Sequence, residues 1–276
     1  MKIKLGENAL RNKKIRDMTM DCFELRGKTA LITGGSRGIG RAIALRLSEA
    51  GANVIVNGRN AEACAAVAEE IAQKGGQAVP LPFNISKMED ITELARQSMA
   101  AFGKIDIFVG NAAANPYHGP VLDVGMDAFD KIVSTNIKAN LLLCRKLVPP
   151  MAERRDGVVI FITSVAGIQA SDGLGIYGMS KAAEASLARN LAAEHGPDNV
   201  RVNCIAPGLI RTDFARSLWE DPERLAETER AYPLRRIGEP DEIAGTALWL
   251  ASPAGAFVTG QVIVVDGGVS IVGKRV

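Results

Sequence analysis

The stretch Lys28-Thr-Ala-Leu-Ile-Thr-Gly-Gly-Ser-Arg-Gly-Ile-Gly40 decides the fold of this chain. Its apolar first half predicts a β-strand over residues 28–33, and helical periodicity begins at Gly38. Small residues between a strand and a helix let the backbone approach a pyrophosphate at the positive N-terminus of the helix. The stretch therefore predicts a dinucleotide-binding unit, although a tight turn with close helix packing gives a similar pattern.

Short apolar runs alternate with helical periodicity through the rest of the chain, which is the pattern of a parallel sheet covered by helices. Strands are expected over residues 28–33, 53–56, 77–83, 105–110, 157–163, 200–205 and 262–265. Helices are expected over residues 38–50, 61–74, 87–102, 127–153 and 177–195. Right-handed crossovers then give an α/β fold, a doubly wound seven-stranded parallel sheet (Rossmann fold) in a single domain, with ligands at the carboxyl ends of the strands.

The composition excludes several classes of function. The 276 residues are 47% hydrophobic and 23% charged, which suits one well-filled core, and the net charge of +2 gives no general attraction to nucleic acid or to anionic membranes. Four widely spaced cysteines and two histidines suggest neither a disulfide framework nor a metal site. Since no long apolar run or apolar leader is present, we expect a soluble, cytoplasmic protein.

Residues 1–24 differ from the rest of the chain because lysine and arginine outnumber acidic residues there. We interpret them as an N-terminal extension ahead of a domain over residues 25–276. A flexible arm, an oligomer contact, an import peptide and an over-long start before Met18 or Met20 all remain open as explanations.

The end of the second expected strand indicates the cofactor. NAD-specific sites normally place an acidic side chain there to bind the ribose 2′-hydroxyl, and Asn57-Gly58-Arg59-Asn60 contains none. The guanidinium groups of Arg37 and Arg59 could instead hold a 2′-phosphate, so we expect NADP(H) over NAD(H). Either arginine could also be an ordinary surface residue.

Tyr177 and Lys181 lie four residues apart in an expected helix and so share one of its faces. A free tyrosine titrates near ~10 and exchanges protons poorly at neutral pH unless something stabilises its phenolate. A nearby ammonium could do so by lowering the tyrosine pKa. The same spacing on a surface helix usually means only a solvated face.

Taken together, the motifs resemble those of the short-chain dehydrogenase/reductase family over residues 25–268. The glycine pattern at residues 33–40 and the Y-x-x-x-K pattern at Tyr177 and Lys181 both match. Ser164 lies thirteen residues before Tyr177, and Asn136 lies forty-one before it, as in the family. The resemblance implies that Tyr177 exchanges a proton with the substrate oxygen, that Ser164 hydrogen-bonds that oxygen, that Lys181 lowers the tyrosine pKa and holds the nicotinamide ribose, and that Asn136 retains a relay water.

The resemblance also implies the cofactor-binding set and the assembly. The expected cofactor contacts are Gly34, Ser36, Arg37, Gly38, Ile39, Gly40, Arg59, Asn84, Ile85, Asn111, Ala112, Tyr177, Lys181, Pro207, Gly208, Ile210 and Thr212. Two positions depart from the family pattern: Ala113 replaces a usual glycine, and Asn84 replaces an aspartate that accepts from the adenine amino group. The family suggests a homotetramer, or a homodimer, with helices over residues 141–148 and 182–193 at one interface.

The local sequence at residues 111–117, 201–212, 218–219 and 235–240 is similar to that of the peroxisomal-type NADP-dependent carbonyl and retinal reductases, and this resemblance implies reduction of apolar ketones or aldehydes. The ending Lys274-Arg275-Val276 is not a peroxisomal address, so we do not expect that location. Residues 209–238 are expected to cover the substrate as a lid. Candidate substrate contacts are Tyr117, His118, Phe214 and Trp219, although the last two could equally be core aromatics and His118 an ordinary loop histidine.

We therefore expect a small-molecule oxidoreductase, most simply a carbonyl reductase. A 3-oxoacyl-(acyl carrier protein) reductase shares the motifs, and Arg235 and Arg236 could help to bind its acidic carrier. A sugar-acid dehydrogenase is a third possibility. A cofactor-binding sensor or scaffold is the non-enzymatic alternative, and the intact Ser164, Tyr177 and Lys181 set argues against it.

Overall fold

The computed structural model describes residues 22–272, and it contains one parallel sheet of seven strands in the order β3-β2-β1-β4-β5-β6-β7. The strands are β1 Thr29–Ile32, β2 Asn53–Asn57, β3 Ala78–Leu81, β4 Ile107–Gly110, β5 Gly157–Ile162, β6 Val200–Pro207 and β7 Val262–Val265. The predicted doubly wound fold is confirmed. The extension over residues 1–24 falls almost wholly outside the described residues, as does the C-terminal ending.

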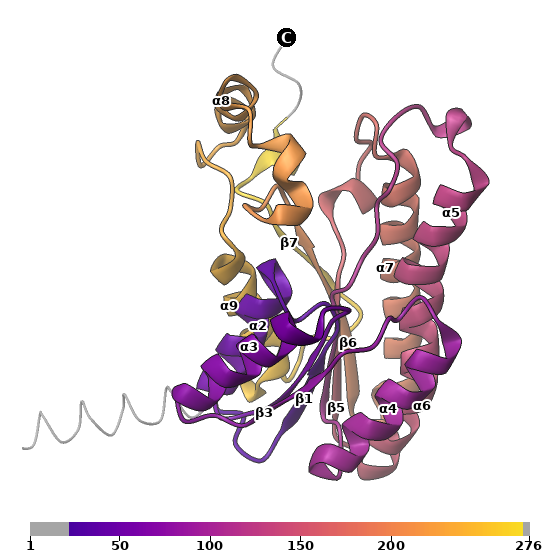
Figure 1. The fold of residues 1–276 in the computed structure, drawn as a ribbon, viewed down its shortest axis with the longest axis vertical. Helices are drawn as coiled ribbons and strands as arrows, with labels where there is room; N and C mark the ends of the chain where they lie inside the picture. The colour runs from indigo at the N-terminus through magenta and orange to yellow at the C-terminus, as the bar shows by residue number, and fades with distance from the viewer. Residues whose placement is uncertain (1–21, 273–276) are drawn as a thin grey trace, which may run out of the picture.

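Helices cover both faces of the sheet (Figure 1). On one face lie α2 Gly38–Glu49, α3 Ala61–Gln73 and α9 Pro240–Ala251. On the other lie α4 Met88–Phe102, α5 Met126–Ile132, α6 Ala139–Arg154 and α7 Gly175–His195. α8 Pro222–Ala231 projects beyond the sheet. Among the described residues, no helix has the length and apolarity needed to cross a bilayer.

Alternate residues of each strand build two separate cores. In β1, Leu31 packs into the core under α4, α6 and α7, whereas Ile32 joins the core under α2 and α9. Phe108 of β4 lies on the side of Leu31, and its ring meets Phe161 edge-on with 6.3 Å between centroids. Because both faces of the sheet are buried, the strands are almost continuously apolar, as expected of a parallel sheet.

The chain reverses its direction of winding between β1 and β4, which are neighbours in the sheet although two strands separate them in sequence. Such a switch point leaves a crevice at the carboxyl ends of the strands. The loops that follow β1, β4, β5 and β6 therefore meet at one edge of the sheet, where the site lies.

The single helix expected over residues 127–153 is interrupted in the structure. α5 ends at Ile132, a π-helical turn occupies Val133–Lys138, and α6 begins at Ala139. π-helical turns widen a helix locally and occur often at functional sites. Here the turn carries the buried Asn136, whose amide is bonded to the loop after β4, and local periodicity does not reveal this tertiary contact.

Candidate active site

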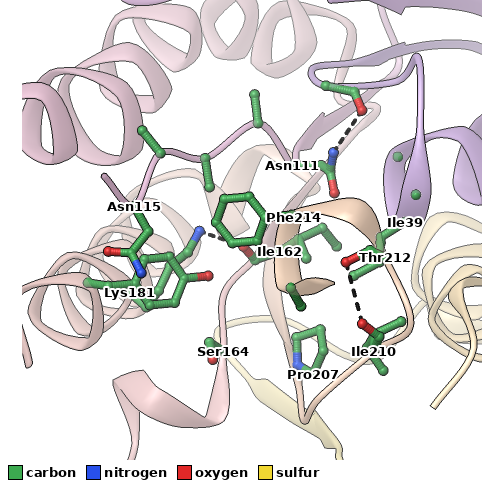
Figure 2. Close-up of a pocket in the computed structure, with 18 of the residues that line it drawn as sticks. Ile39, Asn111, Asn115, Ile162, Ser164, Lys181, Pro207, Ile210, Thr212 and Phe214 are labelled. Atoms are coloured by element: carbon green, nitrogen blue, oxygen red, sulfur yellow. Dashed lines mark hydrogen bonds between the residues drawn. The ribbon is translucent and has the colours of Figure 1, made fainter. Parts of the chain in front are cut away.

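A cavity of about 810 Å³ opens at the carboxyl edge of the sheet, between the glycine-rich loop and α7 (Figure 2). Every residue predicted to contact the cofactor lines it. Ser164, Tyr117, His118 and Phe214 line it as well, whereas Asn136 and Trp219 do not. Figure 2 shows Asn115 and Lys181 toward one side of the pocket and Ile39 and Thr212 toward the other.

The glycine-rich loop packs so closely that its glycines leave no room for a Cβ atom. A Cβ on Gly40 would lie 2.2 Å from the carbonyl oxygen of Gly34, and a Cβ on Gly34 would lie 2.8 Å from Nδ2 of Asn111. Gly38 has a positive φ of 53°. Arg37 caps α2 without any side-chain hydrogen bond, so no side chain occupies the positive end of this helix beside the cavity. The loop thus fits the pyrophosphate of a dinucleotide.

The far end of the cavity is basic. Arg37 and Arg59 both line it, and neither forms an ion pair with another residue of the described chain. The Asn57 amide is committed to the carbonyl oxygens of Leu81 and Phe83, at 2.9 and 3.0 Å. Among the residues lining the cavity the acidic one is Asp213, which belongs to the lid segment. This arrangement suits a 2′-phosphate better than a bare ribose hydroxyl.

Asn84 lines the cavity but uses its acceptor elsewhere. Its Oδ1 accepts from the Ser86 hydroxyl at 2.9 Å and from the Ser86 backbone N–H at 3.2 Å. We expected this oxygen to accept from the adenine amino group. Since the oxygen already has two donors, contact at this position would fall to other groups of the loop, such as Ile85, which also lines the cavity.

Lys181 is buried at the other end of the cavity and is held by two partners. Its Nζ donates to the carbonyl oxygen of Ile162, at the end of β5, over 2.8 Å. It also donates to the two carboxylate oxygens of Glu184, at 3.1 and 3.0 Å. The same Nζ lies 5.6 Å from the centre of the Tyr177 ring. Lys181 and Glu184 have side-chain exposures of 1% and 0%, so the ion pair is shielded from solvent.

The surroundings of Tyr177 act on its pKa in opposite directions. Burial raises the pKa above the ordinary value of 10.0, the Lys181 ammonium lowers it, and the Glu184 carboxylate raises it again. Burial also raises the pKa of Glu184, to about 7, although Lys181 and Asn140 oppose this. Lys181 therefore acts on the pKa of Tyr177 in the predicted direction, while burial and the Glu184 carboxylate raise this pKa in the protein without its cofactor.

Ser164 follows β5 and begins the short helix Val165–Gly167, where its Oγ accepts from the backbone N–H of Ala166 at 3.1 Å. The hydroxyl proton remains available for donation into the cavity, which Ser164 lines together with Tyr177. The serine side chain thus caps a turn and can also meet an oxygen beside the tyrosine.

Asn136 is fully buried and holds backbone together. Its Oδ1 accepts from the N–H of Ala114 at 2.8 Å, while its Nδ2 donates to the Ala114 carbonyl at 3.1 Å and to the Ser180 hydroxyl at 2.9 Å. Its own carbonyl oxygen accepts from Asn140 at 2.9 Å. Asn136 therefore ties the loop after β4 to α7, and its role with a relay water stays a prediction.

Of the four predicted substrate residues, Tyr117, His118 and Phe214 line the cavity, whereas Trp219 does not. Phe214 is about half exposed and its ring lies 6.2 Å from that of Tyr177, which places an apolar surface over the cavity. His118 packs against Gly173, and Tyr117 donates to the carbonyl of Pro120 at 2.6 Å. Trp219 lies outside the cavity lining, since its indole donates to the Thr212 carbonyl at 3.0 Å and its ring faces Arg211.

Three polar residues of the site were missed in the sequence. Glu184 follows Lys181 by three positions and continues the buried stripe of α7 that Ala188 and Ala192 extend, so an acid on an apolar face was the available signal. Asn115 and Thr135 line the cavity, and each has a buried oxygen without a hydrogen-bond partner. No sequence pattern that we used pointed to these two.

Similarity to known proteins extends over most of the chain. A family described as enoyl-(acyl carrier protein) reductase matches residues 34–270. The protein named dehydrogenase/reductase SDR family member 4 from Bos taurus is 39% identical over 244 residues, covering 88% of each chain. Its namesake from Caenorhabditis elegans is 35% identical and covers 91% of this chain and 98% of the relative.

Solved structures of similar sequence also match this chain over most of its length. A 7α-hydroxysteroid dehydrogenase, complexed with NADH and 7-oxo glycochenodeoxycholic acid, superimposes with a TM-score of 0.85 at 38% identity, covering 90% of this chain and 96% of that one. A gluconate 5-dehydrogenase from Burkholderia cenocepacia, in complex with NADP and tartrate, gives 0.88 at 31% identity, covering 92% and 100%.

Proposed function

The chain belongs to the short-chain dehydrogenase/reductase family, and from that premise we propose that it is an NADP(H)-dependent reductase of apolar ketones and aldehydes. The family is one of oxidoreductases that interconvert alcohols and carbonyls. The identity of the substrate and the preference for the phosphorylated cofactor are the specific parts of the proposal.

The observation that carries the proposal is the placement of Tyr177 and Ser164 in one cavity with the glycine-rich loop. When bound, the nicotinamide would supply or take up the hydride. Tyr177 would give its hydroxyl proton to the carbonyl oxygen as that oxygen gains charge, and Ser164 would donate a hydrogen bond to the same oxygen. Lys181, fixed against β5, would favour the phenolate that remains.

The lining of the cavity favours an apolar substrate. Ile162, Val165, Leu174 and Phe214 lie among the residues that form the cavity with Tyr177. A sugar acid would need a cation for its carboxylate, and among the lysines and arginines lining the cavity Lys131 alone is neither ion-paired nor placed at the cofactor end. Lys181 is paired with Glu184, Lys131 donates to Ser86 at 3.0 Å, and Arg37 and Arg59 belong to the cofactor end.

The 3-oxoacyl-(acyl carrier protein) reductase alternative has less support from the surface. Arg236 is paired with Glu242 at 2.6 Å, and Arg235 donates to the carbonyl of Arg230. Both guanidinium groups are thus already engaged. A steroid or gluconate dehydrogenase role rests on the names of similar structures only.

We also propose that residues 209–238 act as the substrate lid and that the enzyme is a homotetramer. The lid proposal is supported by Leu209, Ile210, Leu218 and Tyr232, which line the cavity from this segment. Phe214 would exclude water from the reacting groups when the lid covers a substrate.

The test is to follow NADPH oxidation with a panel of apolar diketones, retinal-like aldehydes, an acetoacetyl thioester and a keto sugar acid. Apolar carbonyls are expected to give the highest kcat/KM. Replacing Tyr177→Phe should lower kcat by about 10²- to 10⁴-fold, the usual contribution of a general acid, while NADPH still binds. Turnover by the variant close to that of the wild type would remove Tyr177 as the proton donor, and a preference for the keto acid would replace the proposed substrate class.

A further inference from the structure

Glu184 is a buried carboxylate that the proposed reaction does not use. Its side chain has no exposed surface, it does not line the cavity, and both of its oxygens accept from Lys181. Burying a carboxylate is costly unless it is paired and hydrogen-bonded. The position of Glu184 beside the ammonium that faces Tyr177 therefore calls for a chemical explanation.

The Lys181 ammonium has three protons, and the surrounding acceptors determine where they point. One proton goes to the Ile162 carbonyl, and the Glu184 carboxylate accepts from the same nitrogen at about equal distances through its two oxygens. Asn140 in turn donates to Glu184 Oε1 at 3.2 Å. The ammonium is thus held between the end of β5 and the Glu184 carboxylate of its own helix, at the edge of the cavity that Lys181 lines.

We propose that Glu184 is a positioning residue whose carboxylate fixes the Lys181 ammonium and offsets part of its charge, and thereby sets how strongly Lys181 stabilises the Tyr177 phenolate. The proposal deepens the proposed function and rests on it for its catalytic meaning. The opposite signs with which Lys181 and Glu184 act on the pKa of Tyr177 agree with it.

The other groups around Glu184 do not compete with the ion pair between Glu184 and Lys181. On its own helix the charged or titratable neighbours are Lys181 and Tyr177. From β6, Cys204 donates to the Glu184 carbonyl at 4.0 Å, and burial, with the charge of Glu184, raises the pKa of this thiol to about 12. From α6 and β5 the facing groups are the neutral Asn140 amide and the Ile162 carbonyl. The thiol therefore remains neutral, and Glu184, whose pKa is about 7, supplies the negative charge at the alkaline pH where a tyrosine titrates.

The experiment is an ultraviolet titration of tyrosinate in the free protein, read within milliseconds of a pH jump so that alkaline unfolding does not interfere. The chain has three tyrosines, so the signal of a matching Tyr177→Phe protein is subtracted to isolate Tyr177. In Glu184→Gln the midpoint is expected to fall by about one pH unit, which is the low end of the change that a neighbouring charge makes in a pKa.

Two further variants make the test specific. Glu184→Asp keeps the negative charge and should keep its midpoint close to that of the wild type. Glu184→Met replaces the carboxylate with an apolar chain of similar length, and it should lower the tyrosinate midpoint as Glu184→Gln does. If the Glu184→Gln protein does not fold, the Glu184→Met protein provides the same test. A folded neutral variant whose midpoint is unchanged or higher would overturn the proposal, and so would an equal shift in Glu184→Asp.

This titration needs neither nucleotide nor substrate, so its outcome is separate from that of the activity assays. Absence of reductase activity in the wild type would contradict the proposed function but would not change the result of the tyrosinate titration. Where turnover is found, the pH profile of kcat for alcohol oxidation should move to lower pH in both neutral variants, since that direction requires the phenolate. A purely structural role of Glu184 would lower stability without moving either midpoint.

Discussion

An ammonium taken out of water needs acceptors for its protons, and Lys181 finds them in the Ile162 carbonyl and the Glu184 carboxylate. Breaking such a buried pair by removing one partner typically costs about 3–5 kcal/mol, because the other charge stays buried without compensation. The Lys181–Ile162 hydrogen bond ties α7 to the end of β5, and Glu184 compensates the charge of Lys181 within the helix. The stability of α7 and the proposed proton transfer from Tyr177 therefore depend on the same three groups, which are the Lys181 ammonium, the Glu184 carboxylate and the Ile162 carbonyl.

At the cofactor end, single arginines are expected to decide between NADPH and NADH. Arg37→Ala and Arg59→Ala each remove one free guanidinium from the cavity lining. A hydrogen bond to a charged phosphate contributes about 1.5–3 kcal/mol, so we expect each change to raise the KM for NADPH by about 10- to 100-fold. The KM for NADH, which has no 2′-phosphate, should change little, and steady-state kinetics with both cofactors measures the difference.

Arg41→Ala is the matched control for these substitutions. Arg41 lies on the same helix, α2, but pairs with Glu70 and does not line the cavity. It should leave both KM values unchanged. Equal losses with NADPH and NADH in the Arg37 and Arg59 variants, or equal efficiency of the wild type with both cofactors, would contradict an NADP(H) preference.

Single residues of the site differ in how far the sequence could predict them. The resemblance to the family motifs predicted that Ser164, Tyr177 and Lys181 share a cavity, and they do. The balance of charge around Tyr177 was not predictable in this way, since the contribution of Glu184 depends on its burial, which is a property of the packed helix. Spacing finds residue types that meet, whereas a pKa depends on everything that surrounds them.

At the scale of elements, the start of α2 is the most tightly constrained part of the cofactor site. In Gly40→Ala the new Cβ would lie 2.2 Å from the Gly34 carbonyl oxygen and 2.5 Å from the Asn111 amide, so the loop would have to shift. Overpacking of this kind costs about 1–3 kcal/mol. We expect that loss in the free energy of unfolding, measured in urea, together with weaker dinucleotide binding by fluorescence titration.

Gly245→Ala in α9 provides the control for this change. A Cβ there meets nothing within 4 Å, and an exposed glycine inside a helix destabilises it by roughly 0.5–1 kcal/mol relative to alanine. This variant should be more stable than the wild type and should bind the dinucleotide with the same affinity. A Gly40→Ala protein with unchanged stability and binding would show that the loop does not need its close contact with α2.

Most of the expected elements were found within a few residues of their expected ends, whereas no helix was expected at α8 Pro222–Ala231. The strand expected over residues 262–265 is β7 Val262–Val265, and the helix expected over residues 61–74 is α3 Ala61–Gln73. Apolar runs and their breaks mark such elements because their burial is local to the sequence. The π-helical turn Val133–Lys138 was not found, since its cause is the bond of Asn136 to the distant Ala114.

At the scale of the whole molecule, the site arises because the loops after β1, β4, β5 and β6 share one edge of the sheet. Parallel winding makes this convergence a consequence of topology, so it could be predicted once the alternation of strands and helices was seen. The depth of the cavity could not, because it depends on how the side chains around it pack. The lid over residues 209–238 stays a prediction, and the contact between the rings of Phe214 and Tyr177 agrees with it.

The outer faces of α6 and α7 are the surfaces from which the expected homotetramer would be built. Within the interface segment expected over residues 182–193, Ala185, Ala188 and Ala192 are buried within the subunit, and they cannot contact a second copy. Ala182 and Ala193 remain exposed on α7, and Leu141 of α6 is 41% exposed. A stable assembly would bury this leucine and the small residues of the α7 face.

Light scattering on the purified protein at micromolar concentration is therefore expected to give four times the mass of the chain. Leu141→Glu would place a carboxylate in the interface and should shift the mass toward smaller species, because a buried unpaired charge is strongly unfavourable. Leu122→Glu is the matched control, since Leu122 is 95% exposed and lies on the short helix Val121–Asp123, outside both interface helices. A wild type that is monomeric would reject the assembly, and equal masses for the two variants would mean that the contact lies on another face.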